Sequence, residues 1–549
     1  MPEIPRSADR IFTNGTILTM VDARPVAETV CVLNGKIAAV GTADEIVPAW
    51  RSDRSEIVDL GGRTLVPGFL DGHSHFINAV RLATWTNVSA PPVGPVRSIP
   101  DLVDTLKSVA AQRATKPGDW IMAYGYDATA MTDGRNLTRA DLDPHFPDNP
   151  VLVLHVSLHG AVLNTRGFAQ TGFDLRAPAP AGGFTERIAG SGEAAGLVME
   201  TSFLPIFMNM PAPSAAEQLD SMDAAQQLYA SNGYTTVQDA PMEPKTRPLY
   251  HRAADEGRFY LDVVGYVNWM ELAALIEGRA EPFGEGYRNR FRVGGVKVIA
   301  DGSPQGKTAF WTKPLLTPGP GGEKNWRGEP NVTPEELGNA VKLAYERDVQ
   351  VMVHCNGDAA IDMLLDAHAA AGAPAGRRTV VIHSQFVRPD QLEKYVAYDF
   401  LASFFTNHAF FWGDVHVENL GKERAYFLSP TRTASELGIR FSNHSDFAVT
   451  PLNPMFILWT SVARASRSGQ VIGPSERISP MRGLRALTID AAYQYGEERS
   501  KGSIEPGKAA DFAILDANPT TVETDRIKDV RVVETVKDGI TVFRATERP

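Results

Sequence analysis

Short apolar runs alternate with longer stretches of helical composition through most of the chain. The apolar runs have the length of buried strands and are bounded by turn residues. Residues 215–232 and 359–370 have helical composition, and Thr333-Pro334-Glu335-Glu336 is typical of a helix N-terminus. Strands are predicted at 66–71, 234–239, 261–267, 292–300, 350–354, 379–383, 399–405 and 439–444. Eight strands with helices between them predict an α/β protein with a closed (β/α)8 TIM barrel.

Both ends of the chain have a different pattern, in which short β-rich runs are separated by turns. Asn34-Gly35 near the N-terminus and Asp538-Gly539 near the C-terminus each lie between two such runs and are hairpin signals. The simplest architecture is one small β-sandwich domain made from 1–65 and 500–549, with the barrel, 66–499, inserted between its two parts. The ends of a domain commonly lie close together, which makes this arrangement possible.

The stretch from about 76 to 233 is too long for a single β/α crossover within the barrel. We therefore predict an insertion at this point. Its role has two interpretations, a lid or pocket wall over the barrel mouth and a passive excursion of the chain. The sequence does not choose between them.

The composition is that of an ordinary globular protein, and it argues against several classes of partner. Of the 549 residues, 43% are hydrophobic and 22% charged. The net charge of −11 argues against a nucleic acid or an anionic membrane as partner. Two cysteines, Cys31 and Cys355, are too few for a disulfide framework or a Cys-based zinc site. There is no apolar signal core and no run of eighteen apolar residues, so we expect a cytoplasmic protein.

His73 and His75 stand one residue apart, directly after the first predicted barrel strand. Residues i and i+2 of a strand point to the same face, so both imidazoles can reach one metal ion. The alternative is two chance histidines in a turn. It is weakened by further polar residues near the ends of later predicted strands, namely Lys297, His354, His383 and Asp446. The carboxyl ends of the strands are where such barrels keep their catalytic residues.

Lys297 lies inside an apolar run, where a charged amine is costly to bury. One interpretation is a salt bridge, or a lysine whose amine extends into solvent. The other is an uncharged amine, which reacts with carbon dioxide to form a carbamate. The two oxygens of a carbamate can bridge two metal ions.

The donor types in this set favour a divalent metal, with zinc preferred. Three or more nitrogen ligands together with carboxylate oxygens suit zinc, and manganese, iron, cobalt and nickel stay open. Two metal ions about 3.5–4 Å apart can hold one hydroxide between them. A site with fewer ligands would hold one metal ion and one water molecule.

Five stretches of the chain carry motifs that can be compared as a set. They are 67–75 (PGFLDGHSH), 124–127 (YGYD), 296–303 (VKVIADGS), 354–362 (HCNGDAAID) and 502–512 (GSIEPGKAADF). Together they resemble the amidohydrolase superfamily, and within it the YtcJ-like metal-dependent hydrolases that include N-substituted formamide deformylase. The resemblance runs over nearly the whole chain.

The resemblance implies a barrel with a composite β-sandwich, a homo-oligomer and a centre of two metal ions. It places His73, His75 and Asp446 on the first ion, His354 and His383 on the second, and a carboxylated Lys297 between them. Every one of these positions is filled in this sequence.

Three segments depart from the pattern of the family. Residues 381–385 read VIHSQ where EHAQ is more usual, and 443–447 read NHSDF where Gly-Ser-Asp is commoner. Residues 404–412 are more aromatic than the usual Gln-Pro-x-His. We expect Phe404 and Phe405 to pack in the core, whereas 410–412 lie beyond the strand and suggest an aryl or apolar substrate.

The leading hypothesis is hydrolysis of an amide-type, non-peptide C–N bond, linear or cyclic, in a small molecule. A metal-bridging hydroxide attacks the carbonyl carbon, and Asp446 acts as general base and then general acid. His408 is a candidate donor to the substrate carbonyl, and Asp301 could orient Lys297 or a polar group of the substrate. For both, the alternative is a hydrogen-bonded buried polar residue.

Two other classes of function are weighed against this hypothesis. One is a mononuclear deaminase or other hydrolase of the same superfamily, with one metal ion and an unmodified Lys297. Deaminases usually have a catalytic Glu after the fifth strand, and His354-Cys355-Asn356-Gly357 offers none. The other is a non-catalytic scaffold, which would normally lack some of the ligands.

Overall fold

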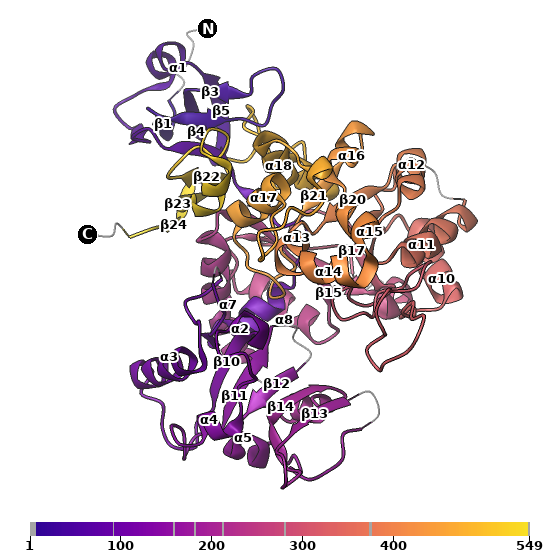
Figure 1. The fold of residues 1–549 in the computed structure, drawn as a ribbon. Coiled ribbons are helices and arrows are strands. Elements are labelled where there is room, and N and C mark those ends of the chain that lie inside the picture. Colours follow the sequence, from indigo (N-terminus) through magenta and orange to yellow (C-terminus); the bar gives the residue numbers. More distant parts are fainter. Residues whose placement is uncertain are drawn as a thin grey trace. The chain divides into compact units, whose positions relative to one another are not determined.

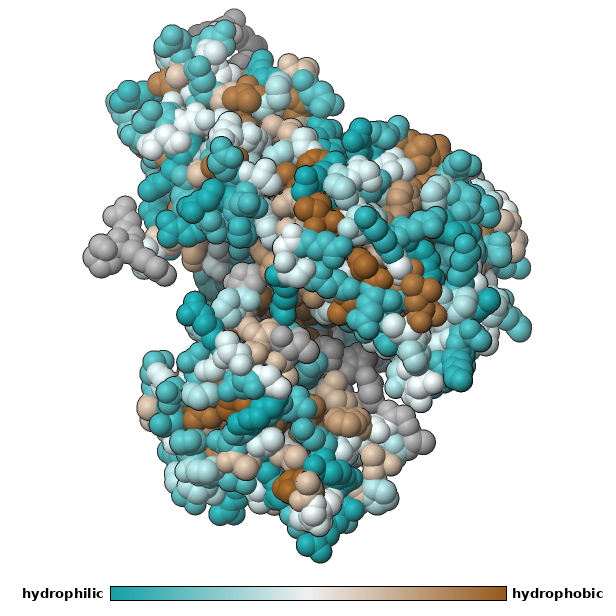
Figure 2. Space-filling model, viewed as in Figure 1, coloured by the Kyte–Doolittle hydropathy of each residue, from teal (hydrophilic) through white to brown (hydrophobic). Residues whose placement is uncertain are grey.

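The structure is a computed structural model that describes residues 7–91, 93–156, 160–180, 183–210, 213–278, 281–372 and 376–546. The chain forms two compact units, one from 7–77 with 222–546 and the other from 78–221 (Figure 1). On the face drawn in Figure 2, hydrophilic residues predominate and the hydrophobic ones form small separate patches. None of the described helices is long and apolar enough to cross a membrane.

An eight-stranded parallel sheet forms the centre of the larger unit. Its order is β21 (Phe441–Asn443), β20 (Leu401–Phe404), β19 (Val380–His383), β18 (Gln350–Cys355), β17 (Phe291–Ile299), β16 (Asp262–Asn268), β15 (Tyr234–Met242) and β8 (Phe69–Leu70). The segments after the two edge strands touch, since Asp446 N–H donates to His73 O at 3.2 Å and His75 N–H donates to Phe447 O at 3.1 Å. The sheet is therefore curled. The prediction of an α/β protein with eight such strands is confirmed.

Helices connect these strands in the way that parallel pairing requires. They are α7 (Ala215–Ala230), α8 (Thr246–Asp255), α9 (Leu272–Glu277), α10 (Pro334–Glu346), α11 (Asp358–Ala370), α12 (Pro389–Tyr398), and α13 (Asn407–Phe411) to α16 (Thr431–Glu436). Helix α10 begins at the predicted capping box: Thr333 Oγ1 accepts from Glu336 N–H at 3.2 Å, and Glu336 Oε2 accepts from Thr333 N–H at 2.8 Å. After β21 follow α17 (Pro454–Ala463), α18 (Pro480–Ala486) and α19 (Ile489–Gln494).

Strands from both ends of the chain form two further sheets in the larger unit. One has the order β5 (Lys36–Gly41), β4 (Thr29–Leu33), β1 (Arg10–Thr13) and β6 (Glu56–Asp59). The other has the order β24 (Ile540–Arg544), β23 (Val532–Lys537), β22 (Phe512–Leu515), β7 (Thr64–Pro67), β2 (Thr16–Leu18) and β3 (Val26–Ala27). Both predicted hairpins are present, and their turn residues have positive φ, for example +51° at Asn34 and +72° at Gly35.

The first predicted barrel strand, 66–71, is divided in the structure, which corrects that prediction. Residues up to Pro67 belong to β7, and only β8 joins the eight-stranded sheet. The backbone changes partners at Gly68, whose N–H donates to Asp511 O, whereas Phe69 N–H donates to Gly233 O. A Cβ atom at Gly68 would lie 2.4 Å from Thr235 Cγ2, so this crossing point requires glycine.

Asp262, at the start of β16, lies between two buried ammonium groups from the C-terminal segment. Its Oδ2 is 2.6 Å from Lys501 Nζ and 2.9 Å from Lys537 Nζ. Burial raises the pKa of Asp262, but the two ammonium groups outweigh burial and hold that pKa well below its usual value. We expect Asp262→Ala to lower the free energy of unfolding by about 3–5 kcal/mol, because both buried cations lose a partner.

The pH dependence of this effect follows from the lowered pKa. The stabilisation is complete above the unfolded-state pKa of about 3.9 and is lost as the pH falls toward the folded-state value. Urea unfolding of wild type and Asp262→Ala at pH 7 and at about pH 3.5 measures both quantities. Equal unfolding free energies at pH 7 would contradict the assignment.

The smaller unit has its own sheet and its own apolar core. Its strand order is β13 (Gly183–Arg187), β14 (Ala194–Glu200), β12 (Gly160–Leu163), β11 (Val151–His155), β10 (Ile121–Tyr126) and β9 (Thr86–Asn87). Its longest helix, α3 (Ile99–Gln112), buries Ile99, Leu102, Val103 and Leu106. The boundaries of the predicted insertion, and its role as lid or excursion, stay predictions.

Candidate metal centre

The six predicted ligands come from five strands of the curled sheet, near or just beyond their carboxyl ends. His73 and His75 follow β8, Lys297 and His354 lie in β17 and β18, and His383 ends β19. Asp446 follows β21. The structure brings these side chains into two groups, and the rings of His73 and His383 connect the groups at a centroid distance of 5.5 Å.

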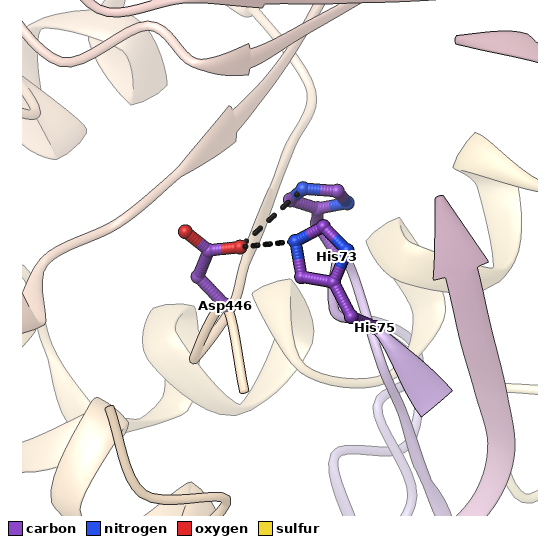
Figure 3. Close-up of side chains that lie close together, drawn as sticks. All are labelled: His73, His75 and Asp446. Carbon is purple, nitrogen blue, oxygen red and sulfur yellow. Dashed lines mark ion pairs between the residues drawn. The ribbon is translucent and has the colours of Figure 1, made fainter. Parts of the chain in front are cut away.

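The first group consists of His73, His75 and Asp446, whose donor atoms converge (Figure 3). Asp446 Oδ1 lies 3.5 Å from His73 Nε2 and 3.3 Å from His75 Nε2. Two atoms that bind one zinc ion at 2.0–2.2 Å in a tetrahedral arrangement are roughly 3.4 Å apart. The observed separations therefore suit three ligands of one metal ion.

Gln238, in β15, determines which nitrogen of His73 carries the proton. Its amide nitrogen donates to Tyr495 Oη at 2.9 Å, so its amide oxygen faces His73 Nδ1, 2.6 Å away. His73 must donate from Nδ1, which leaves an unprotonated Nε2 facing the Asp446 carboxylate. A lone pair and a carboxylate oxygen repel each other unless a cation or a proton lies between them. The arrangement thus fits a bound metal ion.

The second group is formed by His354 and His383. His354 Nδ1 lies 3.1 Å from His383 Nε2, a distance that suits either a hydrogen bond or two ligands of one ion. The other nitrogen of His354 is 3.2 Å from the carbonyl oxygen of Gly302, to which it can donate. The other nitrogen of His383 is 3.1 Å from His444 Nε2.

Lys297 projects its amine toward the first group. Its Nζ lies 3.2 Å from His73 Nε2, and the side chain is almost completely buried. Burial lowers the pKa of Lys297 to about 7, although the Asp446 carboxylate opposes the shift. A substantial fraction of the amine is therefore uncharged at neutral pH.

The pKa values of the surrounding groups favour the protonation states that metal ligands need. Burial, reinforced by Lys297, lowers the pKa of His354 to about 4 and the pKa of His73 well below its usual value. These imidazoles are neutral at pH 7. Burial raises the pKa of Asp446, but the neighbouring His75, His444 and Lys297 outweigh burial and hold this pKa below its usual value, so Asp446 is a carboxylate.

Asp301 lies under the loops that follow β17 and β18. Its carboxylate accepts from the backbone N–H groups of Phe310, Asn356 and Gly357 at 2.8–3.0 Å, and Oδ1 lies 3.4 Å from His354 Nε2. Burial raises its pKa to about 7 even though these hydrogen bonds oppose the shift. The contacts favour a role in holding His354 and its loop over the predicted orientation of Lys297.

His408, in α13, is buried beside a second histidine from α14 (Gly413–Leu420). His408 Nδ1 lies 3.0 Å from His416 Nε2, and the two rings are stacked. His416 Nδ1 is buried and has no hydrogen-bond partner among the described residues. If the His416 proton is on Nε2, then Nδ1 is unprotonated and no buried N–H of His416 is left without a partner. His416 Nε2–H then donates to His408 Nδ1, which is the acceptor. His408 then carries its own proton on Nε2.

The aromatic residues after β20 do not separate into a core pair, 404–405, and a pocket group, 410–412, as predicted. Phe404 packs on Phe441 in the core, as expected. Phe405 contacts the rings of His383, His408 and His444, so core packing describes it only in part. Of the 410–412 group, Trp412 contacts His408 at a centroid distance of 4.5 Å. Phe410 and Phe411 pack against Phe456 of α17.

Three residues of the site were not assigned a role from the sequence, namely Gln238, His416 and His444. His444 carried a signal, since it stands where the resembling family more often has glycine. Nothing in the sequence marks Gln238 or His416 as part of the site. The partner of Gln238 lies far away in the sequence, and the partner of His416 lies across the turn between two helices.

The protein is thus an α/β protein with a candidate metal centre. The centre contains imidazoles, a lysine and a carboxylate at the carboxyl ends of a curled parallel sheet. Comparison with known families gives the more specific class. The model of the amidohydrolase family matches residues 56–543, so the chain belongs to that family and is a hydrolase. This confirms the resemblance drawn from the motifs.

Individual relatives match along almost their whole length. The chain is 28% identical to N-substituted formamide deformylase of Arthrobacter pascens, over 98% of this chain and 99% of the relative. It is 25% identical to the protein YtcJ of Bacillus subtilis strain 168, over 97% and 99%. A metal-dependent hydrolase from Pyrococcus furiosus shares the fold, with a TM-score of 0.72, 24% identity, and coverage of 93% of this chain and 100% of that one.

Proposed function

We propose that the chain hydrolyses an amide-type, non-peptide C–N bond, linear or cyclic, in a small molecule. The observation that carries the proposal is the meeting of two groups of donor atoms beside the buried amine of Lys297. The name of the Arthrobacter relative, a deformylase of N-substituted formamides, agrees with this bond type.

The proposal includes the finer architecture of the larger unit. The contacts between the segments after β8 and β21 support a closed (β/α)8 barrel. The buried cluster that contains Phe12 and Ile17 together with Phe512 and Val536 supports one β-sandwich domain from 1–65 and 500–549. The barrel would then comprise 66–499, with an insertion at about 76–233.

His73, His75 and Asp446 would hold one divalent ion and His354 and His383 a second, with zinc preferred for the excess of nitrogen donors. The uncharged amine of Lys297 would add to carbon dioxide, forming an N–C bond and losing a proton, and the carbamate would face both ions. Bound metal would lower the pKa of a water molecule and polarise a substrate carbonyl.

Two residues of the chain would handle protons and charge on the substrate. Asp446 is a buried carboxylate at the mouth of the sheet, and it would accept a proton from water and pass it to the leaving nitrogen. His408, with its proton on Nε2, would donate to the substrate carbonyl. Trp412, beside His408, supports an aryl or apolar substituent on the substrate.

A substrate screen tests the reaction class. Enzyme reconstituted with zinc and bicarbonate is assayed against N-substituted formamides, N-aryl amides and cyclic imides, with release of amine or opening of the ring as readout. We expect turnover in at least one of these classes. Activity restricted to ring amidines such as aminopurines would instead support the mononuclear deaminase.

Gln238 provides a test of the first metal site. We expect Gln238→Leu to weaken binding of the first ion by about 10–100-fold, because His73 Nδ1 loses the acceptor that fixes its proton. Zinc titration of the metal-free protein against a chromophoric chelator measures this. Gln226→Leu removes a buried glutamine that bonds the backbone near Tyr260 and serves as the matched control. Unchanged affinity in Gln238→Leu would refute the assigned role.

A further inference from the structure

We propose that His444, Ser403 and Ser442 form a hydrogen-bond chain whose direction reverses when a metal ion binds His354 and His383. This hydrogen-bond chain would make His444 a positioning residue that sets which nitrogen of His383 carries its proton. This inference rests on the proposed function, and it adds a role to residues that are not ligands.

The hydrogen-bond chain is continuous and buried. His383 Nδ1 lies 3.1 Å from His444 Nε2, and His444 Nδ1 lies 2.9 Å from Ser403 Oγ. The Ser442 hydroxyl lies 2.8 Å from Ser403 Oγ and 2.7 Å from Gln494 Oε1. All five side chains are at most 2% exposed, so solvent does not compete for these hydrogen bonds.

Gln494 fixes the far end of the chain. Its amide nitrogen donates to Gly72 O at 2.7 Å, which turns its amide oxygen toward Ser442. Ser442 has a single hydroxyl proton, and it can give that proton either to Ser403 or to Gln494. The choice made at Ser442 sets the direction of every hydrogen bond up to His383.

In the first direction, Ser442 donates to Ser403, and Ser403 donates to His444 Nδ1. His444 then carries its proton on Nε2 and donates to His383 Nδ1. His383 carries its proton on Nε2 and donates to His354 Nδ1 across 3.1 Å. This direction pairs the two histidines with each other, and it suits the protein without a second metal ion.

In the second direction, Ser442 donates to Gln494 Oε1 and accepts from Ser403. Ser403 accepts from His444 Nδ1, and His444 Nε2 accepts from His383 Nδ1. His383 then presents an unprotonated Nε2 beside His354 Nδ1, which is what a metal ion requires. Every residue keeps the same number of protons in both directions, so His383 gives up no proton to solvent when a metal ion binds.

Ser403→Ala tests the chain with a small change. Without the Ser403 hydroxyl, an N–H at His444 Nδ1 would be buried and unpaired, so the proton stays on Nε2 and opposes the second direction. We expect the second zinc ion to bind about 10–100-fold more weakly and the first to be unaffected. Ser461→Ala removes another fully buried hydroxyl and is the control.

Substitutions of His444 separate the chain from simple packing. His444→Phe keeps a ring against Phe405 but removes the acceptor for His383, and we expect the same loss of the second ion. His444→Gln can accept from His383 and donate to Ser403, and we expect it to retain the second ion. His368→Phe, at a buried histidine beside Tyr345 and Phe400, is the control.

Zinc titrations of the metal-free proteins, with nitrogen NMR of ¹⁵N-labelled histidines, give the result. We expect zinc to move the His444 proton from Nε2 to Nδ1 in wild type, and His444→Phe and Ser403→Ala to lose only the second ion. Two ions of unchanged affinity in both variants would overturn the chain and spare the proposed function. A wild type that binds only one ion would overturn both the hydrogen-bond chain and the two-metal centre of the proposed function, and the substrate screen would then decide the reaction class.

Discussion

Asp446→Asn is expected to lower kcat by about 10²–10⁴-fold, the range in which a positioned general base and acid contributes to catalysis. The carboxylate lies 3.3 Å from His75 and 3.5 Å from His73, and an amide in its place cannot take a proton at neutral pH. The fold should persist, because the substitution conserves the volume of the side chain. Steady-state kinetics on any substrate found in the screen measures the effect.

The control for this substitution is Asp490→Asn in α19, which changes a buried carboxylate bound to Arg482. It should leave kcat within about twofold of wild type, because Asp490 pairs with Arg482 and neither residue is a proposed metal ligand or proton donor. Metal content is measured on both variants. An Asp446→Asn enzyme that retains its metal and most of its kcat would disprove the general-base assignment.

Lys297→Ala is expected to weaken metal binding by more than about 100-fold and to remove turnover with it. Loss of outer partners of metal ligands costs about 10–100-fold, and Lys297 is proposed as a ligand itself. The variant also leaves a buried space beside His73. A small carboxylate such as acetate or propionate can occupy that space, so we expect partial recovery of metal content and activity when it is added.

Lys297→Arg is the matched comparison, because a guanidinium stays charged and does not react with carbon dioxide. Carbon NMR of protein reconstituted with ¹³C-bicarbonate should show a carbamate in wild type and none in either variant. Full metal content and activity in Lys297→Arg would refute the bridging role.

The strands of the sheet could be predicted because each is a buried apolar run bounded by turn residues. Seven of the eight predicted strands lie in the eight-stranded sheet, and the predicted strand 66–71 contributes only Phe69–Leu70. The hairpins at Asn34-Gly35 and Asp538-Gly539 form as their turn residues require. The prediction failed at 66–68, where one apolar run serves two sheets. Hydrophobicity is the same on both sides of Gly68, and only the hydrogen-bond partners change.

The candidate ligands could be predicted because they stand near the ends of strands that meet at one edge of the sheet. The residues that orient them could not. Gln238 reaches His73 across 165 positions of sequence, and His416 meets His408 through the turn between two helices. The apolar run predicts core packing for Phe405, and its ring also faces three histidines. Such contacts depend on side-chain directions in space, which no spacing rule contains.

The most direct test is the metal content per chain of protein purified without chelator or a metal-binding tag, measured by plasma mass spectrometry. The proposed centre predicts about two ions per chain. One ion would have three ligands and the other two histidines, with the carbamate shared between them. About one ion per chain would contradict the two-metal centre and favour a mononuclear hydrolase at His73, His75 and Asp446. No metal, even after addition of zinc and bicarbonate, would contradict metal-dependent catalysis and favour the scaffold.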